Sequence, residues 1–388
     1  MIANLSSPSG DNGAANTIRE IAQQPAVWRQ VDRIVGESRT ALDAFLRPLK
    51  ADPDLRVVLT GAGTSAFAGE VLSTTLARRL GRRVDAISTT DLVADPQGHF
   101  AGDAPTLLVS FARSGDSPES VATTELAEQV LTTVHHLVIT CNSEGHLART
   151  HAGRPSSYVL LMPPESNDQG FAMTSSFTSM TLAALLALGG EAYEGVTERL
   201  ARAAEWIINS DRADRAVAAL VDREPERIVF LGSAALKGLA GESALKVLEL
   251  NGGTVVTGAE TSLGFRHGPK AVLNERTAVV VYLANDPYTR RYDMDIVAEL
   301  RASHSPDAVV TVTSGSTESP DEGTSHNDWI VPDIGDVDDA ALALPSVVYA
   351  QLIALRSALA RGIRADNPFP SGEVNRVVQG VVLHPLHS

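Results

Sequence analysis

The sequence predicts an α/β protein made of two tandem copies of one unit, each with a mostly parallel sheet and helices on both faces. The first observation behind this prediction is a duplication. The run RVVLTGAG from Arg56 recurs as RIVFLGSA from Arg227, and TLLVSFARSGD from Thr106 recurs as TAVVVYLANDP from Thr277, both 171 residues later. The shorter runs LVIT and VVT end at the same offset. Three apolar runs that share one offset indicate an internal repeat.

The second observation is that helical patterns fill the segments between these apolar runs. Short β-branched runs that alternate with helices are typical of a parallel sheet covered on both faces, a flavodoxin-like three-layer sandwich. We expect helices over Ser65–Gly81, Ser117–Leu131, Phe177–Gly190, Gly238–Gly253 and, ahead of the first unit, Thr17–Ile34. The polar run Ser314–Asp328 predicts a loop. The expected domains are an N-terminal tail and helical segment (1–45), the first unit (46–212), the second unit (213–365) and a C-terminal tail covering the site (366–388).

Composition narrows the class of protein. With 388 residues, 44% of them hydrophobic and 20% charged, the chain is long enough for two globular domains. A net charge of −15 and 5% aromatic residues argue against nucleic acid as a partner, because phosphate backbones need basic surface and bases need stacking platforms. No apolar stretch approaches the ~20 residues of a membrane span, so no membrane partner is expected. The N-terminus lacks the features of a signal peptide, and the one cysteine, Cys141, fits a cytoplasmic protein in which it is a small buried apolar residue.

The loop after the first apolar run admits two kinds of ligand. Gly61, Gly63 and Ala66 satisfy the G-x-G-x-x-G/A fingerprint of dinucleotide sites. Thr64 and Ser65, however, place two hydroxyl groups at the start of the expected helix, where a single phosphate can bind. The equivalent loop of the second unit, Gly232-Ser233-Ala234-Ala235, lacks the second glycine, so we favour a monophosphate over a dinucleotide.

The loop SFARSGDSPES strengthens the phosphate hypothesis. Ser114, Ser117 and Ser120 lie around Gly115 where a strand is expected to turn into a helix. Hydroxyl groups and free N–H groups at a helix N-terminus suit a phosphate dianion. The alternative is ordinary capping, with Ser117 as the N-cap and a proline after it. The neighbouring Arg113 either adds positive charge to the site or is an ordinary solvated surface arginine.

Acid–base candidates lie in the second unit. Glu242, Lys246 and Glu249 are spaced by four and three residues, which puts them on one helical face. The alternative is an exposed face of ion pairs. His267 follows between glycine-containing turns, flanked by basic residues, and the alternative there is a surface histidine. A carboxylate and an imidazole are the minimum set for moving protons on a sugar phosphate. The histidines show no metal-ligand spacing, so neither a metal nor a cofactor is expected.

Taken in order, the motifs GAGTS, SFARSGDSPES, ESALKVLEL and GFRHGPK resemble the sugar isomerase (SIS) domains of phosphosugar enzymes. From EIAQQPAVW through GFAMTSS and DPYTR to NPFPSGEVNRVVQG, nearly the whole chain after its first fifteen or so residues resembles the AgaS-type subfamily. That subfamily consists of tandem-SIS enzymes described as D-galactosamine-6-phosphate deaminase/isomerases, formerly as tagatose-6-phosphate ketose/aldose isomerases. The resemblance implies two tandem SIS domains and a phosphosugar substrate.

The resemblance also implies roles for individual residues. Glu249 would move the C2 proton of the sugar to C1, and His267 would open the sugar ring from a neighbouring subunit, in a homodimer or a dimer of dimers. Ser65, Ser114 and Ser117 would bind the 6-phosphate. The full set assigned to substrate binding is Gly63, Thr64, Ser65, Arg113, Ser114, Gly115, Ser117, Thr174, Ser175, Ser233, Glu242 and Lys246.

The sequence departs from the synthases that share these motifs. Ala112 stands where they have a phosphate-contacting serine, and their C-terminal lysine has no counterpart in VNRVVQGVVLHP. No glutaminase domain precedes the first unit, so ammonia release is expected rather than ammonia use. Four alternatives stay open: aldose–ketose isomerisation without deamination, glucosamine-6-phosphate deamination, a non-catalytic SIS module that senses a phosphosugar, and an NAD(P)-dependent oxidoreductase.

Overall fold

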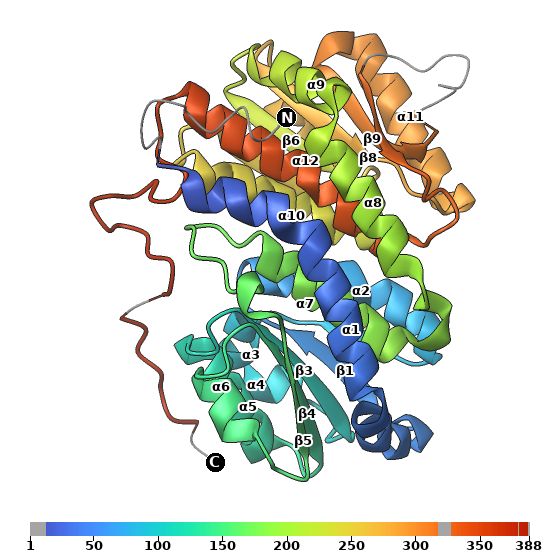
Figure 1. Ribbon diagram of the computed structural model, residues 1–388, viewed down its shortest axis with the longest axis vertical. Coiled ribbons are helices and arrows are strands. Elements are labelled where there is room, and N and C mark those ends of the chain that lie inside the picture. Colours follow the sequence, from blue (N-terminus) through green and yellow to red (C-terminus); the bar gives the residue numbers. More distant parts are fainter. Residues whose placement is uncertain (1–12, 317–326, 379, 387–388) are drawn as a thin grey trace. The chain divides into compact units, whose positions relative to one another are not determined.

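The computed structural model describes residues 13–316, 327–378 and 380–386. Its contacts divide the chain into two compact units (Figure 1). The first unit consists of Val27–Asp168, Ser175–Glu194 and Gly372–Ser388, and the second of Met1–Ala26, Gln169–Thr174 and Gly195–Ser371. Both units are discontinuous in sequence, and α1 (Ala15–Ala51) begins in one and ends in the other. The expected domain boundaries stay a prediction.

The first unit contains a five-stranded, fully parallel sheet in the order β2-β1-β3-β4-β5. Its strands are β1 (Arg56–Thr60), β2 (Val84–Ala86), β3 (Thr106–Ala112), β4 (Val134–Thr140) and β5 (Ser157–Leu161). Its helices are α2 (Thr64–Leu80), α3 (Thr89–Ala94), α4 (Pro96–His99), α5 (Pro118–Val130), α6 (His146–His151) and α7 (Ser175–Gly189). Every residue of β3 is buried, as expected for a central strand covered on both faces.

Helices cover both faces of this sheet. Val58 and Leu108 pack with residues of α3 and α5, while Leu59, which points to the other face, lies against Gly69 of α2. α7 packs against α2 on that second face. The helices predicted over Ser65–Gly81, Ser117–Leu131 and Phe177–Gly190 are confirmed as α2, α5 and α7. α5 begins at a local signal, since Pro118 occupies its first turn directly after Ser117.

The second unit repeats the same sheet in the order β10-β9-β8-β6-β7. Its strands are β6 (Arg227–Leu231), β7 (Val256–Glu260), β8 (Thr277–Tyr282), β9 (Val309–Gly315) and β10 (Asp328–Pro332). Its helices are α8 (Val196–Asn209), α9 (Asp211–Val221), α10 (Ala235–Leu250), α11 (Pro287–Ser303) and α12 (Asp339–Ala360). Short 3₁₀ turns complete the chain at Pro164–Ser166, Gly190–Tyr193, Gly264–Arg266, Pro269–Val272 and Pro306–Ala308.

The strand register confirms the duplication and corrects one part of it. Thr106 pairs with Arg56, and Thr277 with Arg227, so the first two runs are equivalent at 171 residues. The third run is not. Val138 of β4 pairs with Ser110 of β3, and Thr311 of β9 pairs with Val281 of β8. Because Ser110 and Val281 are equivalent positions, Val138 is equivalent to Thr311, which lies 173 residues later. The second unit has two more residues between the paired positions of its third and fourth strands, which an apolar run alone cannot reveal.

Two further expectations concern loops. The segment Ser314–Asp328 was expected to be a loop, but its first residues end β9 and its last begins β10. The stretch between them, 317–326, lies outside the described residues. The C-terminal tail after α12 contains neither helix nor strand among its described residues.

The α12 helix corrects the expectation that no apolar stretch approaches the length of a membrane span. It has 22 residues and is long and apolar enough to cross a membrane, but 89% of its apolar window is buried inside the protein. α12 packs on α10, α8 and α9 of the second unit. Its buried polar groups are paired: Ser346 donates to the Leu342 carbonyl, and Gln351 hydrogen-bonds Gln24 of α1. It is a core helix.

Candidate active site

The loop after β1 forms a sharp turn that delivers two hydroxyl groups to the start of α2. A Cβ on Gly61 would lie 2.5 Å from the Cβ of Ser65, so only glycine fits. Gly63 adopts φ 55° and ψ −125°, a conformation that side chains disfavour. Thr64 and Ser65 follow in the first helical turn and are both buried. The glycines of the fingerprint are therefore explained by the turn itself, without a dinucleotide.

The loop after β3 accepts hydrogen bonds from residues that follow β4. The Asn142 side chain donates to the Ser114 carbonyl at 2.8 Å, and the Leu147 N–H to the Gly115 carbonyl at 3.1 Å. Gly115 has φ 72°, the left-handed region that favours glycine. Ser117 is the N-cap residue of α5 but makes no capping hydrogen bond, and its hydroxyl donates to Glu119 at 3.1 Å. Capping alone therefore does not account for this serine.

Two hydroxyl groups that the sequence analysis passed over lie beneath these loops. Thr60 ends β1, Ser110 lies near the end of β3, and the two are register partners in neighbouring strands. Both side-chain oxygens are buried and have no hydrogen-bond partner among the described residues. Because β1 and β3 are parallel neighbours, the loops that leave their carboxyl ends adjoin at one edge of the sheet. In the sequence both residues lie within apolar runs, and such runs predict a buried strand but no role for its hydroxyl groups.

Arg113 is not the surface arginine of the alternative interpretation, because it is only 7% exposed. Its guanidinium donates to the carbonyl of Arg376, 2.8 Å away in the C-terminal tail. The Arg376 guanidinium in turn donates to the carbonyl of Asp168. The tail is thus bound to the loop that contains Ser114. Arg376 was missed because the tail has no periodicity that would place its side chains.

The predicted sugar contacts at Thr174 and Ser175 are both fully buried. Ser175 and Ser176 begin α7, and each donates its backbone N–H and its hydroxyl to the carboxylate of Asp168. A carboxylate at a helix N-terminus is favourable in both charge and hydrogen bonding. A sugar contact from Ser175 requires its hydroxyl to be shared with Asp168, and this role stays a prediction.

In α10 the structure contradicts the exposed face of ion pairs. Glu242 and Lys246 have fully buried side chains, and that of Glu249 is 26% exposed. The Lys246 ammonium lies 2.6 Å from Glu249 Oε2 and 3.6 Å from Glu242 Oε1. α10 packs against α12 and β7, and the side chains of Glu242 and Lys246 are buried in the interior of the second unit. Burying charges is costly unless they are paired, so a buried lysine between two carboxylates, one of them open to solvent, is typical of a functional site.

Tyr282, at the end of β8, adds a neutral donor beside this cluster. Its hydroxyl lies 2.7 Å from that of Ser243 in α10. Burial, with a further contribution from the Glu242 carboxylate, raises the pKa of Tyr282, so its phenol keeps its proton. Tyr282 was not predicted as a site residue, because an aromatic residue in an apolar run predicts only a buried strand.

His267 is exposed and ends the 3₁₀ turn Gly264–Arg266. Gly268 follows with φ 121°, a conformation that only glycine adopts readily. The two flanking cations share one carboxylate: Arg266 lies 2.7 Å from Glu299 of α11, and Lys270 pairs with the same group. Hydrogen bonds from Lys270 and Arg266 lower the pKa of Glu299. These ion pairs fix the loop that presents His267.

The loop after β6 differs from its counterpart in the first unit. Ala234 adopts φ 52° and ψ −122°, close to the values of Gly63. The hydroxyl of Ser233 donates to Asp293 Oδ1 at 2.6 Å, and Ser262 and the Ala284 N–H bind the same carboxylate. Burial raises the pKa of Asp293. A substrate contact at Ser233 requires this bond to be exchanged, and it too stays a prediction.

Two remaining expectations concern Cys141 and metals. Cys141 is buried, as expected, and burial raises the pKa of its thiol to about 12. Within residues 13–316, 327–378 and 380–386, no group of three or more His, Cys, Asp or Glu side chains is arranged to hold a metal ion.

Comparison with known proteins places these features in a family. Residues 51–189 match the SIS domain family. AgaS of Streptomyces coelicolor is 72% identical over 97% of each chain. The D-galactosamine-6-phosphate deaminase AgaS of Shewanella sp. strain ANA-3 is 42% identical and matches 96% of this chain and 93% of its own. The crystal structure of tagatose-6-phosphate ketose/aldose isomerase from Escherichia coli superposes with a TM-score of 0.87 at 37% identity, covering 98% of this chain and all of the other.

Proposed function

The chain belongs to the AgaS family of SIS-domain phosphosugar deaminases and isomerases, and we propose that it deaminates and isomerises a 2-amino-2-deoxy-hexose 6-phosphate. The proposed substrate is D-galactosamine 6-phosphate, and the products are tagatose 6-phosphate and ammonia. The names of the Shewanella deaminase and the Escherichia coli isomerase support this choice. The observation in the structure that carries the proposal is the buried pairing of Lys246 with Glu249, because it holds a carboxylate in place as a base.

The first-unit loops are proposed to bind the 6-phosphate. Ser65, Ser114 and Ser117 supply hydroxyl groups, assisted by Thr64 and by the backbone of Gly115. The N-termini of α2 and α5 add the favourable ends of two helix dipoles. Arg113 is proposed to act from the edge of this site, where Arg376 already accepts one of its hydrogen bonds. Remote binding energy from the phosphate then positions the reacting carbons.

The proton chemistry is assigned to the second unit. His267 transfers the ring proton and opens the pyranose to the free aldehyde. Glu249 removes the proton from C2 and returns it to C1, which converts the 2-amino aldose into a ketose imine. Water adds to C2 of the imine, the C–N bond breaks, and ammonia leaves with the ketose 6-phosphate. Lys246 and Glu242 orient Glu249 and the sugar hydroxyls.

Two further parts of this proposal concern His267 and the C-terminal tail. The exposure of His267 supports a role in a neighbouring subunit, within a homodimer or dimer of dimers. Arg376 is proposed to take the place of the C-terminal lysine, because it is the tail cation that binds beside the Ser114 loop. The C-terminal tail would then cover the site, as its sequence predicts.

Ammonia release tests the proposed function directly. Purified protein is incubated separately with galactosamine 6-phosphate, glucosamine 6-phosphate and non-amino sugar phosphates, and ammonia and ketose are both measured. Equal amounts of ammonia and ketose from galactosamine 6-phosphate support the proposal. Ketose from non-amino sugar phosphates without ammonia from either amino sugar identifies a plain isomerase instead. Binding of the sugar phosphates with no product identifies a sensing module.

A further inference from the structure

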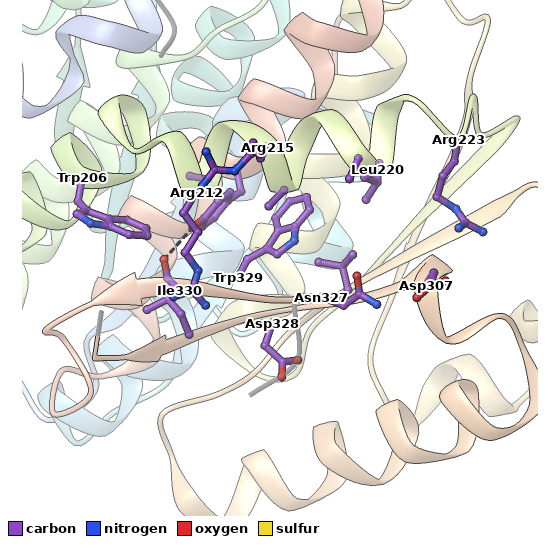
Figure 2. Close-up of a pocket in the computed structure, with 15 residues that line it drawn as sticks. Trp206, Arg212, Arg215, Leu220, Arg223, Asp307, Asn327, Asp328, Trp329 and Ile330 are labelled. Atoms are coloured by element: carbon purple, nitrogen blue, oxygen red, sulfur yellow. Dashed lines mark hydrogen bonds between the residues drawn. The ribbon is translucent and has the colours of Figure 1, made fainter. Parts of the chain in front are cut away.

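The second unit contains a cavity of about 420 Å³ that the proposed chemistry does not use. It lies between α9 and the edge strand β10, with α8 at one end. Figure 2 shows Trp206 and Arg212 toward one end of it and Arg223 with Asp307 toward the other. Its volume falls in the range of about 300–1000 Å³ typical of small-molecule sites.

Three arginines line this cavity: Arg212 and Arg215 of α9, and Arg223 in the turn that follows the helix. Arg212 is half-buried and the other two are exposed. None of the three guanidinium groups has an ion pair or hydrogen bond with any of the described residues. In a protein with a net charge of −15, three arginines without a carboxylate partner along one cavity mark a place for an anion.

The two ends of the cavity differ in charge. Carboxylates approach the Arg223 end, where Asp307 and Asp328 line the wall, and Asp328 already pairs with Arg301 at 2.7 Å. Arg212 and Arg215 are three residues apart on α9, so their side chains leave neighbouring points of the helix. Among the residues that line the cavity, arginines without a carboxylate beside them are therefore found at the Trp206 end.

The rest of the lining is apolar or aromatic. Trp206 is half-buried, and Trp329 packs against Tyr349 with ring centroids 5.1 Å apart. The Tyr349 hydroxyl donates to the Ile330 carbonyl at 2.8 Å, so this floor is fixed and offers flat surface rather than hydrogen bonds. A flat ring stacks favourably on such surfaces, and arginine adds charge to the same contact.

The cavity is separate from the proposed acid–base groups. Asp307 and Asn327 precede β9 and β10, so it lies toward the amino ends of these parallel strands. The loops after β6 and β8 leave from the carboxyl ends of the same sheet. A ligand here would contact neither Glu249 nor His267, and would act as a second, regulatory ligand.

We infer that this cavity binds a nucleoside phosphate. The phosphate pairs with Arg212 and Arg215, the base lies against the aromatic and apolar wall that includes Trp206, and the polar groups of the opposite end face the ribose or the base edge. This inference does not depend on the proposed deaminase activity.

Tryptophan fluorescence of the full chain tests it, because two of the three tryptophans, Trp206 and Trp329, line the cavity. Adenosine monophosphate, uridine monophosphate, inorganic phosphate and galactosamine 6-phosphate are titrated in turn, with stoichiometry checked by calorimetry. We expect one nucleotide per chain, a change in fluorescence that Trp206→Phe reduces, and binding of inorganic phosphate at least about tenfold weaker. Failure of both nucleotides to bind at millimolar concentration would overturn the inference, as would equally tight binding of inorganic phosphate.

The variant Arg212→Ala/Arg215→Ala is expected to weaken nucleotide binding by roughly tenfold or more, because each charge-assisted bond is lost. Arg202→Ala is the matched control: the exposed Arg202 side chain of α8 pairs with Glu198 and does not line the cavity. Equal affinity in the double variant and the control contradicts the site. Both variants should keep deaminase turnover, so loss of nucleotide binding is distinguishable from loss of the proposed function.

Discussion

The loops after β1 and β6 share a backbone conformation and differ in the hydrogen-bond partners of their hydroxyl groups. Gly63 and Ala234 have nearly the same φ and ψ, and each precedes a long helix. In the first unit the following residues are Thr64 and Ser65. In the second unit Ser233 is bound by Asp293, a buried carboxylate of α11. Counted from the first residue of each helix, the equivalent of Asp293 in α5 is Thr124, which is uncharged.

This difference bears on the separate roles proposed for the two copies of the unit. At the edge of the sheet where the first unit is proposed to bind phosphate, the second unit supplies an anion from its own chain, the Asp293 carboxylate. Its N-cap before α11 is likewise a carboxylate, Asp286, where α5 has Ser117. The second unit also buries charged side chains in α10. The positions in α2 that match Glu242, Lys246 and Glu249 are Val71, Thr75 and Arg78.

The largest expected effect on turnover therefore comes from a substitution in α10. Glu249→Gln should lower turnover by about 10²–10⁴ with little change in binding, because the amide cannot accept the C2 proton. The matched control is Arg78→Gln, at the equivalent and exposed position of α2, which should leave turnover unchanged. Steady-state kinetics on galactosamine 6-phosphate measure both. Near-normal turnover in Glu249→Gln removes this residue from the mechanism.

The two sheets should also differ in their response to acid. His136 of β4 and His151 of α6 are buried with ring centroids 4.5 Å apart, and burial, chiefly, lowers the pKa of each to about 4. In the second unit, the strand position equivalent to His136 is occupied by Val309 of β9. Folding keeps these histidines neutral, so the unfolded chain, with its ordinary pKa of 6.5, takes up protons first. Their contribution to stability is complete above pH 6.5 and is lost as the pH falls toward 4.

The loss should approach roughly 3 kcal/mol for each histidine at the acid end of this range. His136→Val, which copies the residue of the second unit, should flatten the pH dependence of the free energy of unfolding. Denaturant titrations at several pH values compare the variant with the parent chain. An identical pH dependence in both would show that this pair is not responsible.

The next smaller effect separates the serines of the two units. Ser65→Ala/Ser114→Ala should lower kcat/KM by roughly 10–100-fold, because two hydrogen bonds to a charged phosphate are lost. Ser233→Ala should leave kcat/KM unchanged but lower the free energy of unfolding by about 1–2 kcal/mol, since Asp293 loses a partner in a buried place. If Ser233→Ala instead raised KM with no change in stability, the second loop would be the one that binds substrate.

The sequence predicted what is local and missed what depends on packing. Gly61 and Pro118 are signals of a turn and of a helix start, and the structure has both where expected. The spacing of Glu242, Lys246 and Glu249 predicted a shared face, but helical periodicity cannot tell whether that face points to solvent or to the protein interior. Arg376 reaches its partners from a tail without periodicity, so nothing in its neighbours placed it.

The smallest expected effect tests the shared turn itself. Ala234 holds a positive φ that costs a non-glycine residue about 1–3 kcal/mol, while glycine costs roughly 0.5–1 kcal/mol through the unfolded chain. Ala234→Gly should therefore raise the free energy of unfolding of the second unit by about 1 kcal/mol. Ala235→Gly, one residue later in the first turn of α10, is the matched control and should lower it by a similar amount, because the same exchange there relieves no strain. The free energy of unfolding of the two variants is compared by denaturant titration, with hydrogen exchange of the β6 amides as the probe. Equal destabilisation by both would mean that Ala234 does not hold the conformation of Gly63 in solution, and that the loop diverged in backbone as well as in side chains.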